Sequence, residues 1–444
     1  MRLPDLSTIR PPRIALTTLG CRVNQSETET LARQFTATGC QVVPFDAPAD
    51  VYVVNTCTVT QVGDRKSRQL LRRAARRNPQ ALVVAAGCYA TVDPATLQAM
   101  PEVGLVVTNA AKSRLPELVL AHLNQTRQVR AVDVPSPLAP ACFHRTRALV
   151  KVQDGCAEGC AYCIVPRARG APRSRPLSEV LAEVQARVAE GHQEVVLTGI
   201  HLGQYGLDLG PDAPTLADLI RAILGGTNVP RLRLSSIEPP DFQPTLLELW
   251  QNPRLCRHLA LPLQSGCDRT LARMGRRYTT ADYARLLKQL RAAVPQIAIT
   301  TDVIVGFPGE TDADHAASLD FAREMAFARI HVFPYSRRQG TPAATMSDQI
   351  DPALKQARAS DFRALGEETG RRYRLQFVGQ QAAVLWETPD PDRPARWVGL
   401  TDTYIRVTTT DPDNLAGRIT PTLLTAVTTG GMTGQVLRLT SGRN

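Results

Sequence analysis

Three cysteines lie close together near the middle of the chain, in the stretch KVQDGCAEGCAYCIVPRARG. Cys156, Cys160 and Cys163 have the spacing C-x3-C-x2-C, with no histidine among them. Soft thiolate sulfur is a ligand that suits zinc and iron–sulfur clusters. Structural zinc sites need four ligands, usually in two pairs, and no fourth ligand stands nearby. The spacing therefore favours a cubane cluster with one open iron for a small molecule over structural zinc.

A second set of cysteines follows predicted strands near the N-terminus. Short apolar runs that read as buried parallel strands alternate with helical segments. The strands are 14–19, 51–54, 81–86 and 105–108, and the helices are 26–38, 64–77 and 95–100. Cys21, Cys57 and Cys88 follow the first three strands. Carboxyl ends of parallel strands share one edge of a doubly wound sheet, so the three thiols should meet there and bind a second metal.

The alternative for this second set is three small core residues, since free cysteine is often buried. The other cysteines, Cys40, Cys142, Cys256 and Cys267, have no equivalent position and are interpreted as ordinary thiols.

Composition changes along the chain indicate three domains. We predict an α/β domain with a doubly wound parallel sheet at 12–130, a proline-rich linker at 131–143, a partial (βα)6 barrel at 144–372 and a small antiparallel β-barrel at 373–440. The partial barrel has predicted strands at 149–152, 194–197, 231–234, 259–261, 298–305 and 329–332, and a helix at 178–190 with Ser178 as N-cap. Six strand–helix units are two short of a closed barrel, which leaves a side gap for a large substrate.

The C-terminal part alternates Val, Thr and Leu in 375–387, 395–409 and 417–439. That pattern is typical of a small β-barrel, which could bind RNA or serve as a structural cap.

Residues after the predicted barrel strands suit a nucleoside-type ligand, because catalytic groups of such barrels lie at the carboxyl ends of strands. They are Thr198, Gly199, Ser236, Glu238, Gln264, Gly306 and Glu310. Each alone also fits ordinary turn chemistry. Four arginines beyond the cysteine loop suggest recognition of carboxylate or phosphate; they are Arg167, Arg169, Arg173 and Arg175.

The net charge is +11 over 444 residues, which favours a polyanionic partner. The helix at 64–77 is densely basic and either binds phosphates or is a solvated face. With 43% hydrophobic residues, global disorder is excluded, and 5% aromatic residues disfavour a binder that works mainly by stacking. The first residues lack the apolar region of a secretory signal, and no stretch is long enough to span a bilayer, so we expect a cytoplasmic protein with reduced thiols and no membrane contact.

The motifs together resemble the radical S-adenosylmethionine (SAM) methylthiotransferase family over nearly the whole chain. The matching stretches are TLGCRVNQSETE, VNTCTVT, AGCYA, QDGCAEGCAYCIVPRARG, LQSGCDRTLARMGRRYT and DVIVGFPGETDAD. The first of them is similar to the branch that acts on N6-threonylcarbamoyladenosine in tRNA, with Arg22 where lysine is usual. The C-terminal domain resembles the TRAM module, which implies tRNA contact.

This resemblance implies SAM and two [4Fe–4S] clusters as cofactors. One cluster would be held by Cys156, Cys160 and Cys163 and would cleave SAM; the other, on Cys21, Cys57 and Cys88, would supply the sulfur. Tyr162 and the strand-end residues named above would contact SAM. The expected product is 2-methylthio-N6-threonylcarbamoyladenosine at position 37 of tRNA, with no catalytic residue beyond the cluster ligands. A monomer and an electron donor such as flavodoxin or ferredoxin are also expected.

Three alternatives remain open. The first is the family branch that acts on isopentenyladenosine in tRNA. The second is a radical SAM enzyme of another reaction class, in which the N-terminal cluster only relays electrons. The third is a non-catalytic RNA-binding protein whose cysteines hold zinc.

Overall fold

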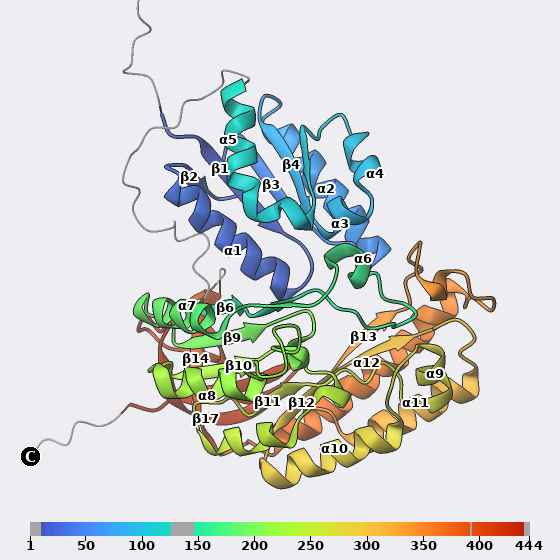
Figure 1. Ribbon diagram of the computed structural model, residues 1–444. Coiled ribbons are helices and arrows are strands. Elements are labelled where there is room, and N and C mark those ends of the chain that lie inside the picture. The colour runs from blue at the N-terminus through green and yellow to red at the C-terminus, as the bar shows by residue number, and fades with distance from the viewer. Residues whose placement is uncertain (1–9, 126–145, 391–392, 439–444) are drawn as a thin grey trace, which may run out of the picture.

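The computed structural model describes residues 10–125, 146–390 and 393–438 (Figure 1). The predicted linker at 131–143, with Cys142, lies outside the described residues, and the domain boundaries remain predictions. Figure 1 shows a blue-to-cyan N-terminal sheet above a green-to-orange barrel. Within the described residues, no helix combines the length and apolar character that crossing a bilayer requires.

One parallel sheet forms the N-terminal part, described over residues 10–125. Its five strands follow the order β2-β1-β3-β4-β5. Their bounds are Arg13–Thr18 (β1), Gln41–Val43 (β2), Val51–Thr56 (β3), Leu82–Gly87 (β4) and Leu105–Val107 (β5). This strand order is one of the two common doubly wound arrangements, with a ligand site where β1 and β3 diverge. The predicted sheet is confirmed, and the short edge strand β2 was not predicted.

Helices cover both faces of this sheet. α1 (Arg22–Ala37) and α5 (Leu115–Gln125) pack on one face, through Phe35 and Val119 among others. α2 (Gln61–Arg77) and α4 (Pro94–Gln98) pack on the other face. The remaining elements are the short helix α3 (Cys88–Val92) and the 3-10 helix η2 (Asn109–Arg114).

Two helices begin earlier than the sequence pattern predicted, and both follow a cysteine of the second set. α1 starts at Arg22 because Cys21 is the extended N-cap residue. α2 starts at Gln61 because the Thr60 side chain accepts a hydrogen bond from the Gly63 amide at 3.1 Å. The turns that carry these cysteines are therefore tight strand-to-helix connections.

The central part, within residues 146–390, is an open barrel of two three-stranded parallel sheets, β10-β9-β6 and β11-β12-β13. The bridges Leu232–Leu255 and Ser236–Ala260 join them. The strands are Arg147–Lys151 (β6), Glu194–Thr198 (β9), Arg231–Leu234 (β10), His258–Ala260 (β11), Ala298–Val305 (β12) and Arg329–Pro334 (β13). No pairing joins β6 to β13 in these residues, which agrees with the predicted side gap.

Helices surround the barrel. They are α7 (Leu177–Ala189), α8 (Leu216–Gly226), α9 (Asp268–Arg273), α10 (Thr280–Ala293) and α11 (Asp312–Met325). The short helix α6 (Val165–Arg169) packs instead against α3 and η2 of the N-terminal part. Shorter pieces are the strands β7 (Gln153–Asp154) and β8 (Arg173–Ser174) and the 3-10 helices η4 (Leu202–Gln204), η5 (Pro239–Asp241), η6 (Pro244–Gln251) and η7 (Pro342–Ala344). The prediction that Ser178 is an N-cap is wrong: α7 begins at Leu177, and Pro176, which pre-sets its own φ, occupies the N-cap position.

A long helix, α12 (Pro352–Leu375), packs against β13 and leads into the C-terminal part. There, within residues 381–390 and 393–436, five strands close a barrel in the order β14-β15-β16-β18-β17, around the buried Trp386. They are Gln381–Asp390 (β14), Arg393–Thr401 (β15), Arg406–Thr410 (β16), Ile419–Thr428 (β17) and Gly431–Val436 (β18). The β16–β18 pair is parallel and the others are antiparallel. The predicted small barrel is confirmed, although its first strand begins later because α12 continues to Leu375.

Candidate active site

The second set of cysteines follows three neighbouring strands of the N-terminal sheet, β1, β3 and β4. Gly20 precedes Cys21 with φ 99°, and a Cβ there would lie 2.8 Å from the Cys57 Sγ. Gly87 precedes Cys88 with φ 99°, and its Cβ would lie 2.4 Å from the Asn55 Oδ1. Glycine is therefore required at both positions, where the ends of the strands approach one another closely.

These thiols share one environment. Cys57 and Cys88 are buried, and Cys21 is exposed. The pKa of Cys57 is raised to about 11, chiefly by burial, with smaller contributions from the neighbouring Cys88 and Cys21. Ionised sulfur is thus costly at this edge unless a bound cation compensates it, which is what an iron–sulfur centre provides. The chemistry of Cys21, Cys57 and Cys88 therefore fits an iron–sulfur cluster.

The radical-type cysteine loop runs between β7 and α6 and is held by its own backbone. The Cys156 amide donates to the Gly170 carbonyl at 3.0 Å, and the Cys163 amide donates to the Cys160 carbonyl at 3.0 Å. Gly155 has φ 74°, and a Cβ there would lie 2.0 Å from the Ala171 carbonyl oxygen. Burial raises the pKa of Cys163 to about 12, and Cys160 and Cys156 add to the shift. This loop also fits a thiolate-bound cluster.

A single metal ion is a different case. In the part of the chain that the structure describes, no three His, Cys, Asp or Glu side chains are placed to hold one ion. A cubane cluster does not need that arrangement, because its three thiolates bind three different irons.

A buried charge network joins the two cysteine sets. The guanidinium of Arg169, six residues after Cys163, donates to Glu27 at 3.0 Å and to Asp154 at 2.7 Å. It also donates to the Asn24 Oδ1 at 2.5 Å. Glu27 further pairs with the ammonium groups of Lys112 at 2.6 Å and Lys151 at 2.9 Å. α1, which starts beside Cys21, is thereby fastened to the segments on either side of the radical-type loop.

Two further contacts bring the sets together. The Asn109 Nδ2 lies 3.5 Å from the Cys88 Sγ and donates to the Ala168 carbonyl at 2.7 Å. Arg338, beyond β13, donates to Thr58 at 2.6 Å and to Asp64 at 2.7 Å, close to Cys57. The cysteine edge of the sheet therefore contacts the carboxyl-end loops of the barrel.

The arginines predicted to recognise carboxylate or phosphate mostly have partners inside the protein. Arg169 binds Glu27 and Asp154, and Arg175 binds Glu183 at 2.5 Å. Arg173 donates to the carbonyl of Arg169, and Arg167 donates to the carbonyl of Gln339. For Arg169 and Arg175, the carboxylates expected as ligands are thus side chains of the chain itself.

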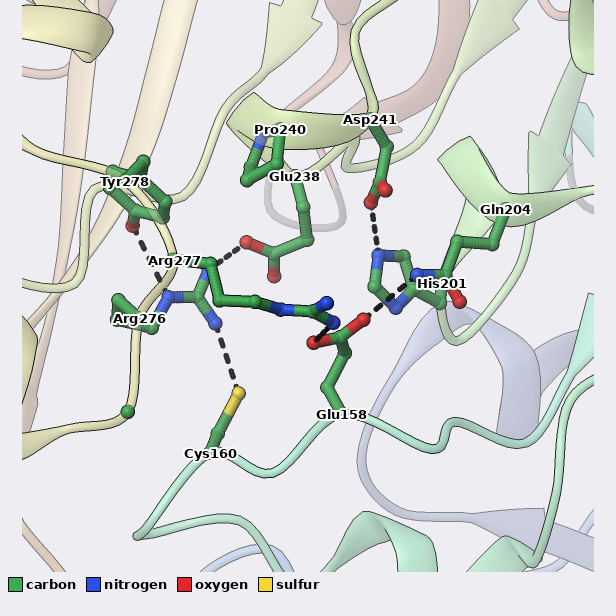
Figure 2. A pocket seen from close by; sticks show the side chains of 11 residues that line it. Glu158, Cys160, His201, Gln204, Glu238, Pro240, Asp241, Arg276, Arg277 and Tyr278 are labelled. Carbon is green, nitrogen blue, oxygen red and sulfur yellow. Dashed lines mark hydrogen bonds and ion pairs between the residues drawn. The ribbon is translucent and has the colours of Figure 1, made fainter.

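A cavity of about 260 Å³ lies beside Cys160, and Figure 2 shows its lining side chains. The Arg276 Nη1 lies 3.2 Å from the Cys160 Sγ, and the same guanidinium pairs with Glu238. His201 pairs with Asp241, and its Nδ1 lies 3.5 Å from the Cys156 Sγ. Such a mixture of cations and carboxylates suits a zwitterion that carries both an amine and a carboxylate.

His201 makes a contact through each of its two ring nitrogens in this cavity. Burial lowers its pKa, but the hydrogen bonds to Asp241 and to Cys156 outweigh burial and raise the pKa to about 9. Sequence reasoning missed both His201 and Arg276. Their signals were present, since His201 follows the end of β9 and Arg276 belongs to the quoted stretch ending GRRYT.

The residues predicted to contact SAM lie in different places. Glu238 lines the cavity, and the Tyr162 hydroxyl lies 3.5 Å from the Arg276 Nη1. Gly199 packs on the Gln153 side chain, and Thr198 is buried at the end of β9.

The other four predicted residues make contacts within the protein. Ser236 bridges to Ala260, and Gln264, at φ 62°, bonds to β12 through its backbone. The Gly306 amide donates to Glu310 at 3.0 Å, and Glu310 pairs with Arg358 at 2.8 Å. All eight assignments stay predictions.

A groove of about 1290 Å³ lies between β13, α12 and the C-terminal barrel. Glu367 is the single acidic residue among those that line the groove. Five arginines line it: Arg329, Arg363, Arg374, Arg396 and Arg406. Phe333, also in the lining, is 45% exposed. Clustered guanidinium groups with an exposed aromatic ring suit a nucleic acid backbone and its bases.

The basic helix α2 is partly neutralised by residues outside it. Arg73 and Arg77 bind Asp46, at 2.6 and 2.5 Å, and Arg72 lies 3.6 Å from Glu102. Arg65 and Lys66 stay exposed. Binding of phosphates by this helix remains a prediction.

Comparison with known proteins finds two matching family models. Residues 13–108 match "Uncharacterized protein family UPF0004", and residues 150–322 match the "Radical SAM superfamily".

Curated relatives cover most of the chain. A "Threonylcarbamoyladenosine tRNA methylthiotransferase MtaB" of Bacillus subtilis is 39% identical over 91% of this chain and 92% of its own length. A protein of the same name from Thermotoga maritima is 37% identical over 84% of this chain and 86% of its own. A "tRNA-2-methylthio-N(6)-dimethylallyladenosine synthase" of Parafrankia sp. is 37% identical over 83% of this chain and 76% of its own.

Among solved structures, the radical S-adenosylmethionine methyltransferase TsrM from Kitasatospora setae is similar, with a TM-score of 0.55 at 17% identity over 76% of this chain and 77% of that one. This likeness supports the fold alone.

Proposed function

The chain belongs to the radical SAM methylthiotransferases, and from this premise we propose that it inserts a methylthio group at carbon 2 of N6-threonylcarbamoyladenosine at position 37 of tRNA. Membership in the family means a tRNA substrate, SAM and a [4Fe–4S] cluster. The finer choice of nucleoside is supported by the names of several relatives that are similar over most of the chain.

The observation that carries the proposal is the set of contacts between the two cysteine sets. Asn24 and Glu27 on α1, and Asn109 beside Cys88, bind the segments around the radical-type loop. Sulfur insertion at a carbon that has lost hydrogen requires both reactive centres at one substrate atom, and this juxtaposition supports that requirement. An electron relay would more naturally use four protein ligands, whereas this edge offers three cysteines.

The residues would act as follows. Cys156, Cys160 and Cys163 would hold the cluster that binds SAM, and Cys21, Cys57 and Cys88 would hold a second cluster. When bound, these groups supply reductive cleavage of SAM and the sulfur to be transferred. Arg276, Glu238 and His201 would orient the amino-acid end of SAM in the cavity beside Cys160. The surrounding buried network would exclude water.

The tRNA would lie along the basic groove between β13 and the C-terminal barrel. We interpret this C-terminal barrel as a TRAM-like module. A flavodoxin or ferredoxin would donate the electron, and the protein would act as a monomer in the cytoplasm.

Product analysis with two cysteine variants tests the proposal. We expect Cys160→Ala to abolish both 5′-deoxyadenosine formation and methylthiolation. Cys57→Ala should keep 5′-deoxyadenosine formation, lose methylthiolation, and lose about half the iron, since one cubane of two is missing. Cys256→Ala, at a buried ordinary thiol, is the matched control. A methylthiolated nucleoside from Cys57→Ala would refute the sulfur-donor assignment.

The dimethylallyladenosine substrate is the second candidate, because the Parafrankia relative is as similar as the Thermotoga one. The two candidates are separated by supplying tRNA that carries either the threonylcarbamoyl or the dimethylallyl group. Only the true substrate gains the mass of a methylthio group.

A further inference from the structure

A tyrosine of the C-terminal barrel is inserted among charged residues of the central barrel. Tyr404, on the turn between β15 and β16, has a left-handed backbone with φ 64°. The Arg233 guanidinium lies 4.8 Å from the centre of its ring, and the His258 ring centre lies 4.6 Å away. Arg233 on β10 and His258 on β11 are buried. The same tyrosine also lines the basic groove described above.

The first residue of α1 contacts this tyrosine. The Arg22 Nη2 donates to the Tyr404 hydroxyl at 2.8 Å, and its Cζ lies 5.6 Å from the ring centre. Arg22 directly follows Cys21. Its side chain therefore connects the turn that carries Cys21 with a tyrosine that lines the groove.

Arg22 differs from the arginines around it in having no anionic partner among the residues that the structure describes. Arg147 pairs with Glu387 at 2.7 Å, and Arg233 pairs with Glu194 at 2.6 Å. Arg22 makes no ion pair with any carboxylate in residues 10–125, 146–390 and 393–438; its one side-chain hydrogen bond there goes to the phenol. A guanidinium has five N–H donors in a fork that matches a carboxylate, so most of its donors are left for a ligand.

The surroundings of the phenol carry excess positive potential. Burial raises the pKa of Tyr404, but Arg22 and Arg147 outweigh burial, and the pKa is lowered. Burial lowers the pKa of His258 well below its usual range, and Arg233 and Arg22 lower it further. The shift at Tyr404 indicates a place that favours an anion, because the guanidinium groups of Arg22 and Arg147 outweigh the burial of the phenol.

We propose that Arg22, held by Tyr404, binds the carboxylate of the threonyl group at N6 of the target adenosine. This inference rests on the proposed function. Carbon 2 and N6 flank N1 on the same edge of adenine, so a nucleoside whose carbon 2 faces the cysteine edge also holds its N6 group close to that edge. Arg22 directly follows Cys21, so its guanidinium lies in the neighbourhood that such an N6 group would occupy. A dimethylallyl group has no charge and would leave the guanidinium desolvated without a partner, which disfavours it.

The test compares two anticodon stem-loops, one with N6-threonylcarbamoyladenosine and one with its neutral methyl ester. We expect Arg22→Met to lower kcat/KM for the acid about 10- to 100-fold, chiefly through KM, and for the ester less than about 3-fold. Equilibrium binding of both RNAs without SAM should show the same difference. Arg22→Lys should restore much of the preference for the acid. Tyr404→Phe changes a residue that is remote from Cys21 in sequence. It should reduce the preference for the acid over the ester about 3- to 10-fold, as loss of one neutral hydrogen bond does.

Arg285→Met is the matched control, because Arg285 is an exposed arginine of α10 that pairs only locally with Asp282. Iron content and 5′-deoxyadenosine formation show whether the Cys21 turn is intact. Equal losses on acid and ester, or a preference that survives both Arg22→Met and Tyr404→Phe, would overturn the recognition role while leaving the proposed function standing. A wild-type protein that modifies only dimethylallyl RNA would overturn both.

Discussion

The two cysteine sets are assembled in different ways. Cys156, Cys160 and Cys163 lie in one loop whose shape depends on local backbone bonds, such as that from the Cys156 amide to the Gly170 carbonyl. Cys21, Cys57 and Cys88 are far apart in sequence and meet only when β1, β3 and β4 pair. The first set therefore depends on one turn, and the second depends on a completed sheet.

The largest expected effects come from replacing the glycine that precedes one cysteine of each set, and these effects should differ between the two sets. Gly155→Ala places a Cβ 2.0 Å from the Ala171 oxygen, and Gly87→Ala places one 2.4 Å from the Asn55 Oδ1. Since misplacement by about 1 Å can cost about 100-fold in rate, we expect Gly155→Ala to lose SAM cleavage and methylthiolation by that factor. Gly87→Ala should lose methylthiolation alone. Quantifying 5′-deoxyadenosine and modified nucleoside in the same reactions checks both.

Gly210→Ala is the control, because Gly210 also has a left-handed φ, 118°, but nothing lies within 4 Å of its added Cβ. Equal loss of both products in the Gly87 and Gly155 variants would mean that the sets are not structurally independent.

Removing the residue that joins the two sets should have the next largest effect. Arg169→Met leaves the buried Glu27 and the partly buried Asp154 without their shared guanidinium, which costs about 3–5 kcal/mol for a broken buried pair. Urea unfolding followed by circular dichroism measures the free energy. Arg323→Met, at an exposed pair with Asp320, should cost less than about 1 kcal/mol. If the two losses are alike, the network does not stabilise the contact between the sets.

Acid should weaken the same connection by a smaller amount. Burial raises the pKa of Glu27, but Lys112, Arg169 and Lys151 outweigh burial and hold it well below 4.5. Because the folded pKa is lower than the unfolded one, this stabilisation is complete above pH 4.5 and is lost as the pH falls through the folded pKa. Glu27→Gln mimics the protonated acid, so it should cost about 1.5–3 kcal/mol at pH 7 and flatten the acid limb of stability. Thermal unfolding midpoints at several pH values compare the Glu27→Gln variant with the wild type. If the variant loses stability at low pH as much as the wild type does, the acid sensitivity belongs to other carboxylates.

Much of the fold was predictable because buried parallel strands are continuous apolar runs. The strands that carry the cysteines matched the prediction within one or two residues at most ends. β2 was missed because it is a three-residue edge strand, and α3 because it is five residues long. Neither has room for a periodic pattern.

The sequence by itself determined which cysteines are candidates to bind metal, since thiolate chemistry and the order of strands are properties of the chain. Only the tertiary structure decided which partners those segments meet. Arg169 binds Glu27 of α1 instead of a ligand, Arg276 reaches Cys160, and Arg22 contacts Tyr404 across 382 positions. The physical reason is that such contacts depend on how separately folded layers pack, and no local period or spacing encodes that packing.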